Sequence, residues 1–241
     1  MENLNVNKFT ENFKNKYLFT SKDIFNYYKK SEPDIKPSTV NWRIYNLVKN
    51  SRINRLGYGK FKIGKVNVYI PDVNSRMVSF YKLLKRKFPL TNICIWDTII
   101  LNEFMIHQAG NSYLIIESDK EVTESIFYYL REKDYKPFLK PNEEIMNRYA
   151  SDEKNSIIIK SLVSESPTQF VNKIKTITIE KILVDVFCDK IIFSSQQGSE
   201  LSNIFKMAFE KYYINKNKML RYAARRRKKD KLMNYLNKVL I

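Results

Sequence analysis

The 241-residue chain has few of the residues that build reactive or cross-linked sites, with only two cysteines and one histidine. Cys94 and Cys188 each lie inside an apolar run with no Cys or His at a metal-ligand spacing. We therefore expect buried, reduced thiols in place of a disulfide or a zinc site. A single His107 excludes a histidine-based metal cluster, and no motif supplies the nucleophile that a histidine-centred triad needs. The sequence predicts a structural His107 near a helix end, no metal, no cofactor and no enzymatic activity.

Glycine and proline are also scarce, with 5 and 7 residues, and no Gly/Ser linker or low-complexity tract is present. This composition indicates compact modules. No stretch approaches the roughly 18 apolar residues that a membrane span needs, and the charged, Asn-rich start lacks the apolar core of a signal peptide. The sequence predicts a cytoplasmic protein without a membrane partner.

Positive charge is concentrated at the two ends of the chain. Residues 1–73 carry 14 Lys and Arg against 6 Asp and Glu, and residues 216–241 carry 10 against 1. The stretch between them carries 19 against 18 and is nearly neutral. Basic modules favour a polyanionic partner, and nucleic acid is the commonest because neutralised phosphates release counterions. Acidic membrane lipid is the alternative polyanionic partner.

The difference in charge between the ends and the middle indicates separate modules. We place the two domains at residues 1–70 and 75–241.

The order of elements in the first domain predicts a winged helix-turn-helix that binds double-stranded DNA. Three helices are expected, at Asn3–Lys16, from Thr20 to a turn at Ser31–Asp34, and at Pro37–Asn50. Thr20 and Asp23 have the spacing of a capping box. A basic hairpin follows, with strands at Arg52–Leu56 and Phe61–Ile63 around a Gly-Tyr-Gly-Lys turn.

The third helix has an apolar stripe, formed by Val40, Ile44, Leu47 and Val48, that packs on the second helix, and the opposite face is polar. Short amides and hydroxyls suit the major groove, whereas basic residues at helix edges and wings meet phosphates. The residues expected to contact DNA are Ser38, Thr39, Asn41, Trp42, Arg43, Asn46, Arg55, Tyr58 and Lys60. Among these residues, Thr39, Asn41 or Asn46 is expected to contact the base edges. Trp42 has two interpretations, because it either packs under the wing or touches DNA.

Beyond a connector at Lys65–Asn74, strands alternate with helices, which predicts a mixed α/β domain, and hence an α+β (α/β) fold class for the chain. The expected strands are Asn92–Trp96, Tyr113–Glu117, Pro137–Leu139 and Ser156–Val163. The expected helices are Arg76–Lys87, Glu121–Glu132, Asn142–Tyr149, a segment from Ile177 to Phe187, and the two long helices Ser199–Asn215 and Lys216–Leu240.

Two charged groups in this domain carry candidate chemistry. Glu180, Lys181 and Asp185 are residue types that metal-dependent nucleases use to cleave phosphodiester bonds. Their helical spacing favours a structural ion pair or cap instead. The last helix carries a basic surface of Arg221, Arg225, Arg226, Arg227, Lys228 and Lys229. It is either a phosphate-binding surface or a solvated face, and a membrane-surface helix is less favoured because no Trp or Phe lies on its apolar stripe.

Nearly the whole chain resembles the AbiEi-type antitoxins of type IV toxin–antitoxin systems. The resemblance rests on the run Val40-Asn41-Trp42-Arg43-Ile44-Tyr45 through Gly57-Tyr58-Gly59-Lys60-Phe61 and on Glu-Lys-Ile-Leu-Val-Asp at 180–185. It implies a transcriptional autorepressor that binds inverted repeats in its own operator. It also implies a C-terminal domain that counteracts a nucleotidyltransferase toxin without a stable complex, as part of phage defence by abortive infection.

Two other functions stay open at this point. A metal-dependent nuclease with a winged-helix targeting domain would bring Glu180 and Asp185 together with a third carboxylate in a cleft. A ligand-responsive transcriptional regulator would have a sizeable apolar pocket in its central domain.

Overall fold

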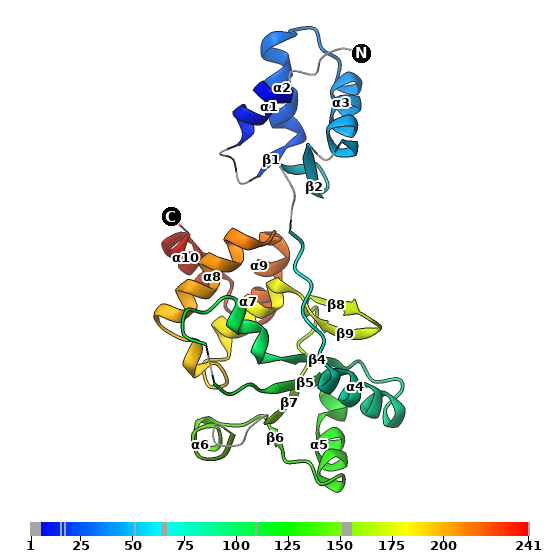
Figure 1. The fold of residues 1–241 in the computed structure, drawn as a ribbon, viewed down its shortest axis with the longest axis vertical. Coiled ribbons are helices and arrows are strands. Elements are labelled where there is room, and N and C mark those ends of the chain that lie inside the picture. Colours follow the sequence, from blue (N-terminus) through cyan, green and yellow to red (C-terminus); the bar gives the residue numbers. More distant parts are fainter. Residues whose placement is uncertain are drawn as a thin grey trace. The chain divides into compact units, whose positions relative to one another are not determined.

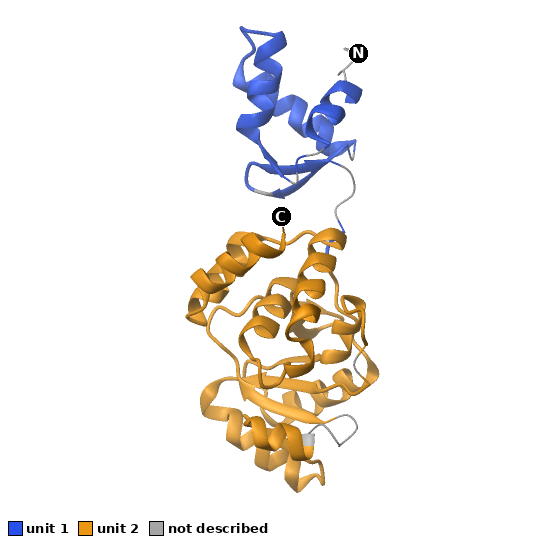
Figure 2. Cartoon of the chain, turned by 90° about the vertical axis from the view of Figure 1, so that its left-hand side faces the viewer, with its two compact units in different colours: residues 1–68 blue, residues 69–241 orange. Residues whose placement is uncertain are grey.

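A computed structural model describes residues 6–14, 16, 18–50, 52–63, 67–108, 110–150 and 156–240. The chain divides into two compact units, residues 1–68 and 69–241, coloured separately in Figure 2. Helices and strands are mixed in both units (Figure 1), so the α+β class is confirmed.

The described residues of unit 1 form three helices and a small antiparallel sheet. Its elements are α1 (Val6–Phe13), β1 (Phe19–Thr20), α2 (Ser21–Ser31), α3 (Pro37–Lys49), β2 (Ile53–Gly57) and β3 (Lys60–Ile63). The sheet has the order β1-β3-β2. The expected first helix is shorter than predicted, ending at Phe13, and its first residues lie outside the described part of the chain. The pairing of Phe19 in β1 with Phe61 in β3 was not expected from the sequence.

Local signals in the sequence explain how these elements begin and turn. Thr20 and Asp23 form the expected capping box at the start of α2. Gly59 takes φ 64° in the hairpin turn, a left-handed conformation that favours glycine. Phe9, Phe13, Phe19 and Phe61 are all buried in one aromatic core with the apolar stripe of α3. This core fixes which face of α3 points outward.

Unit 2 is built around a four-stranded mixed sheet of order β4-β5-β7-β6. Its strands are β4 (Cys94–Asp97), β5 (Leu114–Ser118), β6 (Pro137–Leu139), β7 (Ile157–Ser161), and a separate hairpin of β8 (Thr168–Val171) and β9 (Ile174–Ile177). Its longer helices are α4 (Ser75–Lys87), α5 (Thr123–Glu132), α7 (Ile179–Cys188), α8 (Ser199–Lys211), α9 (Lys216–Arg225) and α10 (Lys229–Val239). Short helical turns are η1 (Thr98–Glu103), η2 (Lys120–Val122), α6 (Glu143–Ile145), η3 (Met146–Ala150) and η4 (Ser194–Gln196).

The sheet is buried because each of its central strands begins with three apolar residues, at 114–116 and 157–159. β5 pairs parallel with β7 and antiparallel with β4, and every residue of β5 is buried. Helix α4 packs against β4 and α5 against β6 and β7, while α7 packs against α8 and α9. The side chain of Lys181 on α7 reaches Glu117 on β5, which places α7 over the middle of the sheet. A charged group of the sheet therefore lies inside the core.

The expected helix Lys216–Leu240 is wrong, because the chain breaks between α9 and α10. Arg227 takes φ 55°. The amide of Lys228 donates to the carbonyl of Ala223 and that of Arg227 to Ala224, which is the hydrogen-bond pattern of a Schellman motif. A glycine usually occupies this left-handed position, and here an arginine does, so no helix-stop signal appears in the sequence.

Among the described residues, no helix combines the length and the apolar character needed to cross a membrane.

Two further boundaries can be compared with the sequence-based prediction. Helix α8 ends at Lys211, four residues before the expected end. Residues 67–74 of the connector contain neither helix nor strand.

Candidate functional site

The outward face of α3 carries two large aromatic side chains. Trp42 and Tyr45 are each 60 % exposed, whereas Val40, Ile44 and Leu47 on the inner face are buried. The interpretation that Trp42 packs under the wing is therefore wrong. Ser38, Thr39 and Asn41 are exposed on the same helix, as expected. Sequence reasoning missed Tyr45 as a surface residue, although it follows Trp42 by three positions and therefore shares its face.

The β2–β3 hairpin adds positive charge next to this helix face. Helix α3 packs against β2, so the hairpin belongs to the same surface of unit 1. Arg55 is exposed, with its guanidinium 5.5 Å from the centre of the Phe61 ring. Tyr58 at the turn is fully exposed and Lys60 is partly exposed. We call the exposed face of α3 together with this hairpin the α3–hairpin surface.

Two residues expected on this surface are used elsewhere. Arg43 forms two hydrogen bonds to Glu32, at 2.7 and 3.0 Å, and lies 4.6 Å from the Tyr28 ring centre. This bidentate pair lowers the pKa of Glu32 and ties the end of α2 to α3, and contact of Arg43 with phosphate stays a prediction. The amide nitrogen of Asn46 is buried without a hydrogen-bond partner among the described residues. Asn46 therefore does not present its amide donor to solvent. The exposed short polar residues of α3 lie near the start of the helix.

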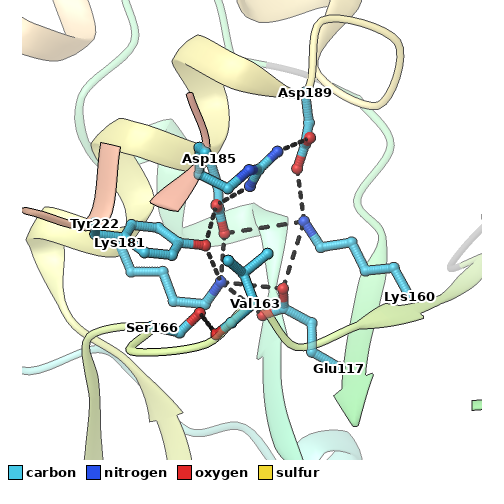
Figure 3. A network of polar contacts seen from close by, with 9 residues as sticks. Glu117, Lys160, Val163, Ser166, Lys181, Asp185, Asp189 and Tyr222 are labelled. Atoms are coloured by element: carbon cyan, nitrogen blue, oxygen red, sulfur yellow. Dashed lines mark hydrogen bonds and ion pairs between the residues drawn. The ribbon is translucent and has the colours of Figure 1, made fainter. Parts of the chain in front are cut away.

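In unit 2, three cations and three carboxylates form a buried charge cluster (Figure 3). Its members are Glu117 on β5, Lys160 on β7, Lys181 and Asp185 on α7, and Asp189 and Arg226 just beyond helix ends. The Lys181 ammonium lies 2.9 Å from a Glu117 oxygen and 2.5 Å from Asp185. Lys160 lies 2.6 Å from Asp189 and 3.4 Å from Glu117. The formal charges of the six groups cancel.

Tyr222 of α9 connects the last helices to this cluster. Its hydroxyl donates to Asp185 at 2.7 Å and accepts from Lys181 at 3.2 Å. Arg226 donates to Asp185 at 2.7 Å and also contacts Asp189. Figure 3 shows the side chains of Tyr222, Lys181 and Asp185 pointing toward one another. The cluster therefore joins the sheet, α7 and the region between α9 and α10.

Mutual neutralisation keeps the buried groups ionised. Burial alone would lower the pKa of Lys181, but the charges of Asp185 and Glu117 raise it well above its ordinary value. Burial would raise the pKa of Asp185, yet the nearby Lys181, Lys160 and Arg226 hold it below its usual range. Burial also raises the pKa of Tyr222 to about 12. For Lys181 and Asp185, these directions are those of a structural salt-bridge cluster in which both groups stay charged.

The expected structural role of Lys181 and Asp185 agrees with this geometry, whereas Glu180 is separate from them. Glu180 accepts from the backbone amide of Asn215 and pairs with Lys218 at 3.3 Å. Glu180 and Asp185 therefore do not converge, and no group of three or more potential metal-ligating side chains was found among the residues that the structure describes. The geometry gives no support to a nuclease site built on this pair.

The C-terminal basic residues do not form one solvated face. The Arg226 side chain is only 15 % exposed and belongs to the charge cluster, so the expectation of a solvent-facing Arg226 is wrong. Arg225 and Arg221 contact Glu165 at the surface. Arg227 and Lys229 are exposed and Lys228 is partly exposed. Arg226 follows the buried Tyr222 by four residues and shares its inward side, while its neighbours stay outside.

The two cysteines and the histidine occupy structural positions. Cys94 and Cys188 are free thiols, the first fully buried and the second partly buried. The imidazole Nδ1 of His107 lies 2.7 Å from Glu200 near the start of α8, which agrees with the expected structural role.

A pocket of about 870 Å³ opens beside the charge cluster in unit 2. Phe187, Ile191, Ile192, Leu201 and Tyr235 supply its apolar wall, and five lysines also line it. A pocket of this kind is the feature that would favour a ligand-responsive protein.

The chain matches two families of protein domains. Residues 5–69 match a domain of unknown function (DUF7669), and residues 39–241 match a family of unknown function (DUF6577). A comparison with curated proteins gave no match. Because the second match covers most of the chain, the protein belongs to the family of unknown function DUF6577.

Proposed function

We propose that this protein is a DNA-binding transcriptional regulator whose unit 1 acts as a winged helix. The observation that carries the proposal is the α3–hairpin surface, where exposed Trp42 and Tyr45 lie next to the basic β2–β3 hairpin. Helix α3 enters the major groove, and the hairpin contacts the flanking backbone.

The physical chemistry of this surface supports nucleic acid over other partners. Exposed aromatic side chains on a helix are costly to leave in water and contact bases or sugars in a groove. Arg55 and Lys60 supply phosphate contacts, and the first 73 residues carry a net charge of +8. Ser38, Thr39 and Asn41 are short, exposed donors and acceptors at the start of α3, where base edges are read in helix-turn-helix complexes.

The first prediction is that the full chain binds duplex DNA with an affinity that falls steeply with salt. Between 50 and 200 mM NaCl we expect a loss of about a hundredfold, the value for roughly four neutralised phosphates. The double variant Arg55→Ala/Lys60→Ala should bind specific and random duplexes more weakly by a similar factor, because phosphate contacts carry no sequence information. Fluorescence anisotropy with a labelled duplex measures both effects.

A matched control for this prediction removes the same two charges from α4, as Lys82→Ala/Arg86→Ala, where both side chains are exposed. It should bind almost as the parent does. Acrylamide quenching locates the contact, because Trp42 is exposed and Trp96, the other tryptophan, is buried. DNA should shield Trp42 from the quencher. Equal losses for both double variants, or unchanged quenching at saturating DNA, would refute binding through the α3–hairpin surface.

The resemblance to AbiEi-type antitoxins extends the proposal to a repressor of its own operon that counteracts a nucleotidyltransferase toxin. Unit 2 has its own hydrophobic core, so antitoxicity and DNA binding can reside in separate units. A stable complex with the toxin is not part of the proposal.

The second prediction tests this division of roles. In cells that express a nucleotidyltransferase-like toxin encoded beside this gene, the full chain should restore growth. Arg55→Ala/Lys60→Ala should restore it equally, because these residues belong to unit 1, while repression of a reporter under the operator should fall. Growth should be scored with both proteins under independent promoters, so that repression does not alter toxin levels. Absence of rescue by the unaltered chain would remove the antitoxin role and leave the DNA-binding result unaffected.

A further inference from the structure

The 870 Å³ pocket of unit 2 has a strongly unbalanced charge. Five lysines line it, namely Lys140, Lys160, Lys190, Lys228 and Lys231, against a single carboxylate, Asp189. Lys160 and Asp189 neutralise each other at 2.6 Å within the charge cluster. The remaining four lysines have no ion pair with a carboxylate in the described part of the chain. A concave site with four uncompensated ammonium groups attracts an anion.

Two helices begin at this pocket and strengthen its preference for negative charge. Gly198 precedes α8 and Lys228 precedes α10, and both residues line the pocket. Neither helix receives a side-chain cap from the residues that the structure describes. The first amide groups of a helix and its dipole favour an anion such as phosphate. A methyl group built on Gly198 would meet no atom within 4 Å, so the backbone here is open to a ligand.

The rest of the lining is apolar and aromatic. Phe187 and Tyr235 are in ring contact at 5.3 Å, and Ile191, Ile192 and Leu201 complete the wall. The Tyr235 hydroxyl is buried and has no hydrogen-bond partner among residues with described positions. A volume of about 870 Å³ falls within the range of small-molecule sites. The pocket combines a surface for a flat apolar group with a cationic rim.

We propose that this pocket binds a small organic phosphate with a flat apolar portion, such as a nucleoside monophosphate. The phosphate lies at the cationic rim, near Lys228, Lys231 and the start of α8. The apolar portion lies against Phe187, Tyr235 and the isoleucines. This site is independent of DNA binding by unit 1 and makes the protein responsive to a metabolite.

The third prediction uses adenosine monophosphate as the probe and the full chain as the protein. Adenosine monophosphate should bind at micromolar to millimolar concentration, raise the melting temperature of unit 2, and bind more tightly than adenosine or inorganic phosphate. Lys228→Ala/Lys231→Ala should weaken binding by at least about tenfold, because each charge-assisted hydrogen bond contributes about that much. Isothermal titration calorimetry measures the affinities.

The matched control is Lys229→Ala/Lys238→Ala, which removes two exposed lysines of the same helix that do not line the pocket. Its affinity should equal that of the parent. Cys188 supplies a local readout, because it lines the pocket while the other cysteine, Cys94, is fully buried. Adenosine monophosphate should slow the modification of Cys188 by N-ethylmaleimide, and Cys188→Ser should abolish labelling.

Several outcomes would overturn the proposal. Binding that falls equally in both double variants would be unspecific attraction to a basic surface. Equal affinity for adenosine and its monophosphate would mean that the phosphate is not recognised. Absence of Cys188 protection would place the ligand elsewhere. A single-stranded oligonucleotide that protects Cys188 better than adenosine monophosphate would make the pocket part of a nucleic-acid surface.

Discussion

Replacing Lys181 by methionine is expected to lower the free energy of unfolding of unit 2 by about 3–5 kcal/mol. Methionine keeps the buried aliphatic stem and removes only the ammonium group. Glu117 and Asp185, which both contact that group, stay buried in the variant. An uncompensated buried carboxylate costs far more than the original pair contributed. The loss is a large fraction of the roughly 5–15 kcal/mol that stabilises a typical domain.

Urea unfolding followed by the fluorescence of Trp96 measures this loss. Trp96 is fully buried in unit 2, where it stacks on Phe193. A Trp42→Phe background removes the signal of unit 1. The matched control is Lys211→Ala, because Lys211 and Glu103 form an exposed pair at 3.8 Å. Such pairs contribute about 0–1 kcal/mol. A loss below about 1 kcal/mol for Lys181→Met would contradict the importance of the cluster's charge balance.

A second change separates charge from packing. Lys181→Met/Glu117→Gln restores the balance of two cations and two carboxylates, so it should recover part of the lost stability. Lower pH should also recover part of the stability that Lys181→Met has lost. A buried carboxyl without its cation has a pKa above its unfolded value, so protonation on acidification stabilises the folded variant. The deficit relative to the parent is therefore expected to be smaller at pH 5 than at pH 8.

Local sequence signals predicted the elements of unit 1 well. Pro37 marks the start of α3, the Thr20–Asp23 spacing gives a capping box, and Gly59 turns the hairpin. Each of these signals acts within a few residues. The two-residue strand β1 was missed because its pairing with β3 joins segments about forty residues apart and leaves no periodic pattern.

Unit 2 was predicted less well where non-glycine residues adopt left-handed conformations. The β8–β9 hairpin turns at Asn172 and Lys173, with φ 49° and 66°, and contains no glycine. Arg227 ends α9 in the same way. Turn and helix-stop rules depend on glycine at such positions, so the hairpin was not expected and α9 and α10 were predicted as one helix.

Two of the six members of the charge cluster could be predicted from the sequence, and the other four could not. Lys181 and Asp185 lie four residues apart on one helix, and this spacing predicts an ion pair. Glu117 and Lys160 come from neighbouring parallel strands, where they are register partners. Their approach to α7 depends on the tertiary fold. Glu180 is adjacent to Lys181 in the sequence and pairs instead with Lys218 of α9, a partner that no local pattern indicates.

Arg225 and Arg226 are adjacent in the sequence, yet their replacement is expected to have very different effects. Arg226→Ala should lower the free energy of unfolding by about 2–3 kcal/mol, because it removes one of the cations that hydrogen-bond Asp185 and Asp189 and leaves the largely buried cluster with one excess carboxylate. Arg225→Ala should lower it by about 0–1 kcal/mol, because its pair with Glu165 is exposed to solvent.

The physical reason for this difference is the helical spacing of the two residues. Arg226 follows the buried Tyr222 by four residues and lies on its inward side, whereas Arg225 is turned from it by about 100° toward solvent. The left-handed Arg227 ends α9 at this point, and the Arg226 side chain contacts the end of α7. The same urea assay, with Trp96 as the reporter, compares the two variants. Duplex DNA affinity should be unchanged in both, since the proposed DNA contacts are in unit 1. Equal stabilities for Arg225→Ala and Arg226→Ala would mean that the contact of Arg226 with the cluster does not stabilise the fold. Loss of DNA binding with retained stability would mean that these arginines bind phosphate.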